Sequence, residues 1–502
     1  MVFSPINFSL MRSLFYLFCS ILCAISLDVQ ATNYYVATTG SDSNTGTLVT
    51  TPYKTIAKAL AKATVAGDTI FVRQGTYTYS TNSPMKLSAT GTETNRICLF
   101  AYPGDQRPVV DFSGQTKYNS SARGFNISGK YWHMKGFCVY NAGDNGIYVS
   151  GENNIVEFCD MYDCGDSGMQ IGNGAANNTI INCDSYFNKD EEDGNADGFA
   201  CKLDVGTGNR FFGCRAWNNS DDGWDGYLRP SNNITTTLTD CWVIQSGYLK
   251  DGSQGQGNGN GFKTAGSDNK DLRHHQTLIR CIAVGNMSKG FDQNNNKGNM
   301  TIYNCLAMDN VKNYGFSSGA LDSDCKLTIK NSIAIGAAGN FCTPNDITNN
   351  SWQNSLTATS VDFESLDWQN QLKLPRKADG ALPDITFAKL LSTSDLIDQG
   401  VNIGEAFVGT APDLGPFEFG TTSSTDIAPI STTQLATVYS VPNTLKISHV
   451  NTSLSVAIYT ASGLLLLSET IDSDVSFCLP QGVVIVRLSS RDASSITKTI
   501  IK

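Results

Sequence analysis

Five charged residues, Asp197, Asp221, Asp222, Asp225 and Lys263, lie close to the glycine of a phrase that recurs along this 502-residue chain. When the copies of the phrase are aligned on that glycine, Asp197 and Asp222 occupy equivalent places on neighbouring copies, and Asp225 falls next to Lys263. Neighbouring strands of a sheet lie about 4.8 Å apart. Unpaired carboxylates at that separation repel strongly unless a proton or a cation lies between them. The spacing therefore predicts a cation site with a lysine beside it.

The residue types at this site indicate which cation would bind. Oxygen ligands without His or Cys favour Ca²⁺ over zinc or copper, and ligands on flexible loops favour Ca²⁺ over Mg²⁺. The alternative is a solvated acidic turn, because Asp is common in turns. A lysine beside a divalent cation has a lowered pKa and can then act as a base. The alternative for Lys263 is a plain salt bridge to Asp225.

The recurring phrase is a glycine followed by a large apolar residue. Its copies are Gly146-Ile147, Gly168-Met169, Gly198-Phe199, Gly223-Trp224, Gly261-Phe262, Gly290-Phe291 and Gly315-Phe316. Such a pair predicts a turn that enters a strand whose first side chain points into the core.

A second recurring phrase contains a cysteine and ends in Asn, Asp or Gly after alternating apolar and polar residues. The cysteines are Cys138, Cys159, Cys183, Cys214, Cys241, Cys281 and Cys305, and Ser332 continues the series. Each phrase reads as a short strand followed by a turn. Coils of about 22 to 30 residues with three such strands describe a right-handed parallel β-helix. The cysteines would then form an inward stack of free thiols rather than disulfides.

The rest of the chain divides around this repeat. Residues 57–66 predict an amphipathic helix that caps the open end of the solenoid. The β-helix domain spans 32–420, and a Ser/Thr-rich linker follows at 421–433. Alternating runs over 434–502 predict a small β-sandwich, which resembles the C-terminal sorting or attachment domains of secreted Gram-negative bacterial enzymes. The expected fold class is therefore all-β.

Composition and the N-terminus constrain the setting of the protein. Residues 1–31 hold an apolar run that is too short for a membrane span, so we expect a cleaved signal peptide and a secreted or periplasmic protein. The net charge is −10, with 36 Lys+Arg against 46 Asp+Glu. This excess of acid argues against nucleic-acid binding, which requires a basic face. We expect a monomer without a membrane span.

Four segments carry a family resemblance: 197–202, 214–225, 259–263 and 289–294. As a set they resemble the signature segments of family nine polysaccharide lyases, and the similarity extends over roughly residues 33–420. The resemblance implies a parallel β-helix with one Ca²⁺ and a Brønsted base. The residues that it implies are Asp197, Asp221, Asp222 and Asp225 as calcium ligands and Lys263 as the base.

Such an enzyme would act on an acidic plant polysaccharide that contains galacturonate, by β-elimination. Calcium would neutralise the uronate carboxylate, and Lys263 would remove the C5 proton. Lys202 and Arg229 are candidate anchors for substrate carboxylates, with solvated surface charge as the alternative. Asp292 and Asn294 are candidates for binding sugar hydroxyls.

Two other functions compete with the lyase. A pectin glycoside hydrolase could use Asp221 and Asp222 as acid and base, but that family adds a Gly-His-Gly segment that none of the four histidines here provides. A noncatalytic adhesin or carbohydrate-binding solenoid would have no reason to place a lysine beside four aspartates. The choice between homogalacturonan and rhamnogalacturonan stays open, and the Gly-, Ser- and Gln-rich insertion at 245–258 is where we expect it to be made.

Overall fold

The computed structural model describes residues 30–420 and most of a C-terminal segment. The described C-terminal residues are 436–441, 444–448, 450, 453–460, 465–479, 482–489 and 494–501. The predicted linker and all but the last two residues of the predicted signal peptide lie outside the described residues. No helix within the described residues is long and apolar enough to cross a membrane.

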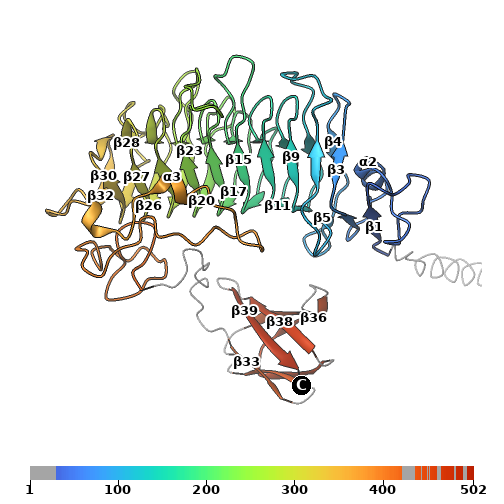
Figure 1. Ribbon diagram of the computed structural model, residues 1–502. Coiled ribbons are helices and arrows are strands. Elements are labelled where there is room, and N and C mark those ends of the chain that lie inside the picture. The colour runs from blue at the N-terminus through green and yellow to red at the C-terminus, as the bar shows by residue number, and fades with distance from the viewer. Residues whose placement is uncertain are drawn as a thin grey trace, which may run out of the picture. The chain divides into compact units, whose positions relative to one another are not determined.

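The described chain is nearly all-β, and its strands form three long parallel sheets, here named A, B and C, of twelve, ten and ten strands. Successive strands along the chain belong to different sheets, and each pairs in parallel with a strand one coil away (Figure 1). This arrangement confirms the predicted parallel β-helix. Two compact units divide the chain, one of residues up to Thr236 with Gln245–His274, the other of Thr237–Ile244 with His275 onward.

The first unit holds the earlier strands of each sheet. Sheet A contributes β1 (Asn33–Val36), β2 (Thr69–Val72), β5 (Ile97–Ala101), β8 (Trp132–Lys135), β11 (Ile155–Glu157), β14 (Thr179–Ile181), β17 (Asn209–Phe212) and the start of β20 (Ile234–Thr239). Sheet B contributes β3 (Thr76–Thr78), β6 (Val109–Asp111), β9 (Cys138–Tyr140), β12 (Asp160–Tyr162), β15 (Asp184–Tyr186) and β18 (Arg215–Trp217). Sheet C contributes β4 (Met85–Leu87), β7 (Phe125–Ile127), β10 (Ile147–Val149), β13 (Met169–Ile171), β16 (Phe199–Cys201), β19 (Trp224–Asp225) and β22 (Phe262–Lys263).

The second unit holds the later strands and two short helical segments. Its strands are β23 (His274–Ile279), β26 (Met300–Tyr303), β29 (Leu327–Lys330) and β32 (Asn345–Thr348) in sheet A, β21 (Trp242–Ile244), β24 (Ile282–Val284), β27 (Leu306–Met308) and β30 (Ile333–Ile335) in sheet B, and β25 (Lys289–Asp292), β28 (Lys312–Phe316) and β31 (Gly339–Phe341) in sheet C. The helical segments are η1 (Ser360–Asp362) and α3 (Trp368–Gln371).

The glycine column has the predicted register over most of its length. Met169 pairs with Phe199, Phe199 with Trp224, and Trp224 with Phe262, and these side chains are buried. The last step was predicted wrongly, because Phe291 pairs with Tyr314 rather than with Phe316. The Tyr314 ring stacks on Phe291 at 5.0 Å and its hydroxyl donates to the Ile333 carbonyl at 2.9 Å, so Tyr314 fills the core position.

The cysteine column is confirmed as a stack of buried free thiols. The Cys159 amide donates to Cys183 Sγ at 3.5 Å, and the Cys281 amide donates to Cys305 Sγ at 3.3 Å. All twelve cysteines whose side chains are described are free. Cys138 is a correction: it pairs in register with Asp160 rather than with the neighbouring cysteine, and the preceding, fully buried Phe137 takes the core position.

The predicted cap helix is shorter than expected. Helix α2 spans Ile56–Leu60, five residues, and the hydroxyl of Thr55 accepts from the Lys58 amide at its start. The prediction of a helix over 57–66 was wrong at its C-terminal end, because Thr64 and Val65 are β-branched and Gly67 has a φ of +94°. The buried side chains of Ile56 and Ala59 attach the helix to the core.

The C-terminal segment forms a separate β-structure, as predicted. Three antiparallel strands, β33 (Thr437–Val441), β34 (Thr444–Ser448) and β37 (Val475–Cys478), make one sheet. Four antiparallel strands, β35 (Leu454–Thr460), β36 (Leu465–Ile471), β38 (Gly482–Ser489) and β39 (Ser494–Ile501), make the other. A shared buried cluster that includes Leu445, Val456 and Val486 lies between them, which is the core of a β-sandwich.

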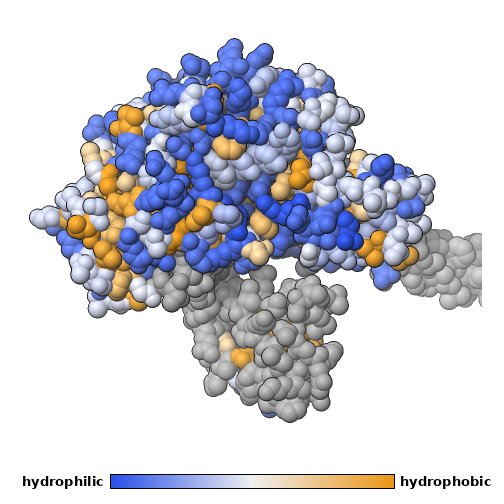
Figure 2. Space-filling model, in the orientation of Figure 1, coloured by the Kyte–Doolittle hydropathy of each residue, from blue (hydrophilic) through white to orange (hydrophobic). Residues whose placement is uncertain are grey.

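Hydrophilic side chains cover most of the face of the molecule that Figure 2 shows. Few large apolar side chains in the described residues are strongly exposed, Val311 and Val361 being the most exposed. A solenoid whose alternate side chains point inward leaves its polar residues outside. Chemistry must therefore be sought where polar side chains are buried instead.

Candidate active site

Three consecutive strands of sheet C, β16, β19 and β22, hold the candidate site together. The Trp224 ring stacks between Phe199, at 4.5 Å, and Phe262, at 5.2 Å, which fixes the register of the three coils. A Cβ atom on Gly198 would lie 2.5 Å from the Ala216 Cβ. Only glycine allows the backbone at position 198 to approach Ala216 this closely. The preceding residue, Asp197, is therefore held against the next coil.

The structure brings together three of the four predicted calcium ligands. Carboxylate oxygens of Asp197, Asp221 and Asp222 all lie within 4.8 Å of one another, and all three residues are buried. Asn260 donates to Asp222 Oδ1 from its backbone amide at 2.8 Å and from Nδ2 at 2.9 Å. The backbone amide of Asn258 donates to Asp221 Oδ1.

Two lysines enter the same cluster. Lys263 Nζ lies 2.9 Å from Asp222 Oδ2 and 3.3 Å from Asp225 Oδ1, in the register predicted from the sequence. Lys202 Nζ lies 2.7 Å from Asp197 Oδ2 and 3.3 Å from Asp225 Oδ2. The fourth predicted ligand, Asp225, thus bridges both lysines. The solvated-surface alternative for Lys202 is wrong, since its side chain is only 8% exposed.

The carboxylates outnumber the ammonium groups, and the pKa values reflect this. Burial, together with the nearby Asp222 and other carboxylates, raises the pKa of Asp221 to about 9. Burial also raises the pKa of Asp197 to about 7, although Lys202 opposes the shift. For Lys263, burial lowers the pKa, but Asp222 and Asp225 outweigh it and hold that pKa well above its ordinary value. Lys263 is therefore a counter-charge to Asp222 and Asp225.

The remaining predicted residues form contacts with other partners. Arg229 has a 63% exposed side chain and an ion pair with Asp268, 2.8 Å from Nε to Oδ2. Asp292 and Asn294 belong to the second compact unit. There Asp292 Oδ1 lies 2.8 Å from Lys289 Nζ and accepts from the Asn294 amide at 3.1 Å.

Sequence reasoning gave no role to Asn260 or Ser167, although both carried a usable signal. Each stands directly before the glycine, in the column that also contains Asp197 and Asp222. Ser167 Oγ donates to Asp197 Oδ2 at 3.2 Å, and Asn260 holds Asp222 from the other side. In this column, the coils on either side of the two aspartates therefore carry neutral hydrogen-bond donors, Ser167 and Asn260.

Comparison with known proteins agrees with this geometry. Residues 34–337 match the family described as Pel9A-like, right handed beta helix region. The chain belongs to this family. Over 395 residues it is 38% identical to Pectate lyase L of Dickeya chrysanthemi. The aligned region covers 77% of this chain and 90% of that relative.

Solved structures extend the relationship to three dimensions. The crystal structure of pectate lyase Pel9A matches with a TM-score of 0.71 and 35% identity, over 78% of this chain and 98% of the other. A structure named Rhamnogalacturonan lyase matches with a TM-score of 0.63 and 26% identity, over 72% and 97%. This member of the Pel9A-like family is a polysaccharide lyase, so the adhesin and hydrolase alternatives are set aside.

Proposed function

We propose that this enzyme cleaves pectate, a chain of galacturonate units, by calcium-assisted β-elimination with Lys263 as the base. Its relatives named as pectate lyases span most of the chain and support the substrate. One observation carries the mechanism: the Lys263 amine lies 2.9 Å from Asp222 inside a buried group of four aspartates. A base and an anion-neutralising centre side by side are what proton removal next to a carboxylate requires.

The donor set fits a calcium ion. Asp197, Asp221 and Asp222 offer only oxygen atoms, which are the ligands that Ca²⁺ prefers. Asp222 Oδ2 is buried and, although it lies 2.9 Å from Lys263, has no partner of hydrogen-bond geometry among the described residues. We assign these three aspartates and Asp225 as the residues that would hold the ion. When bound, calcium supplies positive charge that neutralises the uronate carboxylate and makes the C5 proton more acidic.

The chain's own residues account for the proton transfer. Lys263 Nζ, in its amine form, takes the proton from C5 of the sugar. The electron pair of the C5–H bond forms a double bond between C4 and C5, and the C4–O glycosidic bond breaks. The departing oxygen keeps the electron pair of that bond and takes a proton from water. Asp222 and Asp225 are the groups that hold the pKa of Lys263 high. When these carboxylates act as ligands instead, that hold weakens and the amine becomes available.

The other candidates take supporting parts in this proposal. Lys202, buried between Asp197 and Asp225, orients two ligands instead of meeting the sugar directly. Arg229, exposed beside Asp268, is a candidate contact for a second uronate carboxylate. Asp292 and Asn294 stay candidates for sugar hydroxyls. We further propose that the enzyme is exported, on the evidence of the N-terminal apolar segment.

One assay tests the proposal. Purified enzyme is mixed with polygalacturonate or with rhamnogalacturonan, and the absorbance of the unsaturated uronide product is followed with calcium and with excess chelator. We expect calcium-dependent product from polygalacturonate, with rhamnogalacturonan as the second candidate because one solved relative carries that name. Product formed at an undiminished rate after dialysis against chelator would overturn the metal assignment.

A further inference from the structure

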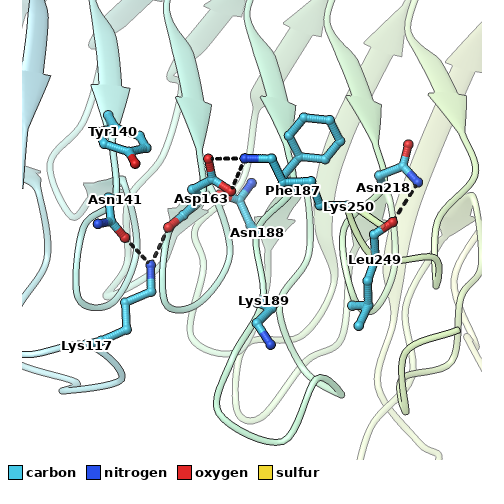
Figure 3. Close-up of a pocket in the computed structure, with 10 residues that line it drawn as sticks. All are labelled: Lys117, Tyr140, Asn141, Asp163, Phe187, Asn188, Lys189, Asn218, Leu249 and Lys250. Carbon is cyan, nitrogen blue, oxygen red and sulfur yellow. Dashed lines mark hydrogen bonds and ion pairs between the residues drawn. The ribbon is translucent and has the colours of Figure 1, made fainter. Parts of the chain in front are cut away.

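A cavity of about 350 Å³ lies in the first unit at the turns that follow the strands of sheet B, on residues that the catalytic proposal does not use (Figure 3). Its walls include Lys117, Lys189 and Lys250 together with the rings of Tyr140 and Phe187. Of the ten residues that line it, three are lysines and one, Asp163, is acidic. The cavity therefore differs in charge from the acidic cluster.

The lysines of this cavity are unequally neutralised. Lys250 Nζ pairs with both oxygens of Asp163, at 2.7 and 2.9 Å, and Lys189 Nζ pairs with Asp193 at 2.6 Å. Lys117 Nζ instead donates to Asn141 Oδ1 at 2.6 Å and to the Asp163 carbonyl, both neutral acceptors. Among the described residues Lys117 forms no ion pair. Its ammonium is half-buried beside an open cavity, where an anion can supply the missing charge.

Two aromatic rings, Tyr140 and Phe187, line the cavity beside these amines, and both belong to a longer row of rings along sheet B. Tyr140, Tyr162, Tyr186 and Trp217 stack along sheet B with ring centroids 5.0, 5.2 and 4.3 Å apart. Phe187 continues the wall with its ring perpendicular to Tyr186, at 5.1 Å. Flat apolar rings beside polar groups suit the CH face of a sugar.

The backbone at Phe187 supports a use for that ring. Phe187 has a φ of +60°, in the left-handed region. The residues at the equivalent turns of neighbouring coils are Asn141, Asp163 and Asn218, types that tolerate this conformation, whereas a bulky residue is disfavoured there. Strain of this kind concentrates at functional sites.

The insertion at 245–258 links this cavity to the active site. Its Lys250 lines the cavity, and its Asn258 amide donates to the carboxylate of Asp221. Between them, a Cβ on Gly257 would lie 2.6 Å from Asp221 Oδ1, so the loop runs directly against this ligand. Asn218, on the cavity wall, is only three residues before Asp221, which limits their separation to about 11 Å.

We propose that this cavity is an accessory subsite that binds the carboxylate of a uronate unit in the substrate chain, at a sugar other than the one that loses its proton. Lys117 and Lys250 bind the carboxylate, and the Phe187 ring covers the CH face. The identity of the ligand rests on the proposed function. The insertion at 245–258 then helps to select acidic chains long enough to reach both sites.

The test measures binding without cleavage. In the Lys263→Ala background, titration calorimetry with a defined oligogalacturonate compares the parent with Lys117→Gln and Lys250→Gln. We expect about tenfold weaker binding for each, the effect of losing one charge-assisted contact. Lys117→Arg should restore most of the affinity. The matched control is Lys130→Gln, which removes an exposed lysine paired with Glu152 at 2.9 Å and should bind like the parent.

Two results would overturn the inference. One is unchanged affinity in both lysine variants; the other is a stoichiometry of two oligosaccharides per protein, which would mean that the cavity takes a separate chain. In the otherwise wild-type enzyme, Lys117→Gln should raise KM for polygalacturonate and leave kcat unchanged, with no change for the shortest cleaved oligosaccharides. If the proposed function itself is wrong, no variant will bind, the Lys130→Gln control included, so the two failures are distinguishable.

Discussion

Aspartates stack on neighbouring coils in two regions of this molecule, and the regions neutralise them differently. In sheet B, Asp160 pairs in register with Asp184. Each has its own arginine: Arg107 donates two bonds to Asp160, at 2.9 and 2.6 Å, and Arg215 donates two to Asp184, at 2.9 and 2.7 Å. Each carboxylate therefore accepts two charge-assisted hydrogen bonds from one guanidinium.

At the start of the strands of sheet C, four aspartates share two lysines, and the pKa of Asp197 and of Asp221 is raised mainly by burial. A buried aspartate that has no counter-charge of its own is therefore the better indication of a functional site. Lysine, unlike arginine, can also give up its proton. The first region is fully paired, and our proposal gives the second region the binding of a cation and the removal of a proton.

Removing calcium should have the largest effect on activity, because the proposed mechanism requires the ion at the cluster of four aspartates. Chelator should abolish activity, and added calcium should restore it. Asp222→Asn should lower activity at ordinary calcium by at least about 100-fold, since it takes one ligand from the set. Calorimetric titration with Ca²⁺ checks the cause. An Asp222→Asn enzyme with normal calcium affinity and normal activity would contradict the proposal that Asp222 is a calcium ligand.

Substituting the base should come next. Lys263→Ala should lower kcat by about 10²–10⁴-fold, the usual contribution of general-base catalysis. Lys263→Arg should fail nearly as badly, because a guanidinium does not release its proton at working pH. Calcium binding measured alongside should persist in both. An active Lys263→Arg enzyme would remove Lys263 from the mechanism.

Breaking an arginine pair in the first region should affect stability and spare chemistry. Arg215→Met removes the guanidinium that pairs with the buried Asp184, which should cost about 3–5 kcal/mol of unfolding free energy. Activity per folded molecule should stay normal. The matched control is Arg229→Met at the exposed Asp268 pair, where no measurable loss of stability is expected. Equal losses in the two variants would contradict the assignment of Arg215 as structural.

Much of the second region was predictable from the sequence, because strand register follows from the glycine column. Aligning Gly198, Gly223 and Gly261 placed Asp197 beside Asp222 and Asp225 beside Lys263, as the structure has them. Local spacing suffices where each coil repeats the same turn. At Tyr314 the alignment was wrong because a large ring, rather than the glycine, takes the core position.

Side-chain direction and partner choice were beyond the sequence. Lys202 lies in the loop after β16, and nothing in its position indicated that it turns inward to Asp197. Arg107 reaches Asp160 across 53 residues of chain, a contact that no repeat encodes. The cavity at Lys117 likewise combines turns from several coils with an insertion, so it emerges only when the coils are stacked.

The smallest expected effect concerns a paired carboxylate, Glu157, whose pKa shifts in the direction opposite to those of Asp197 and Asp221. Glu157 in sheet A accepts from His133 at 2.8 Å and pairs with Lys135 at 2.6 Å. Burial raises its pKa, but these two partners outweigh burial and lower that pKa from 4.5 to about 2. A carboxyl whose pKa is lowered in the folded state stabilises the fold at pH values above its unfolded-state pKa, and it loses this contribution as the pH falls through the folded-state pKa.

The unfolding free energy of the wild type should therefore exceed that of Glu157→Gln by about 1–3 kcal/mol above pH 4.5, and the gap should close toward pH 2. Urea unfolding of both proteins across this range measures the gap, with Glu152→Gln at an exposed pair as the control. A gap that does not change with pH would mean that Glu157 contributes through packing, and that pairing does not set its charge.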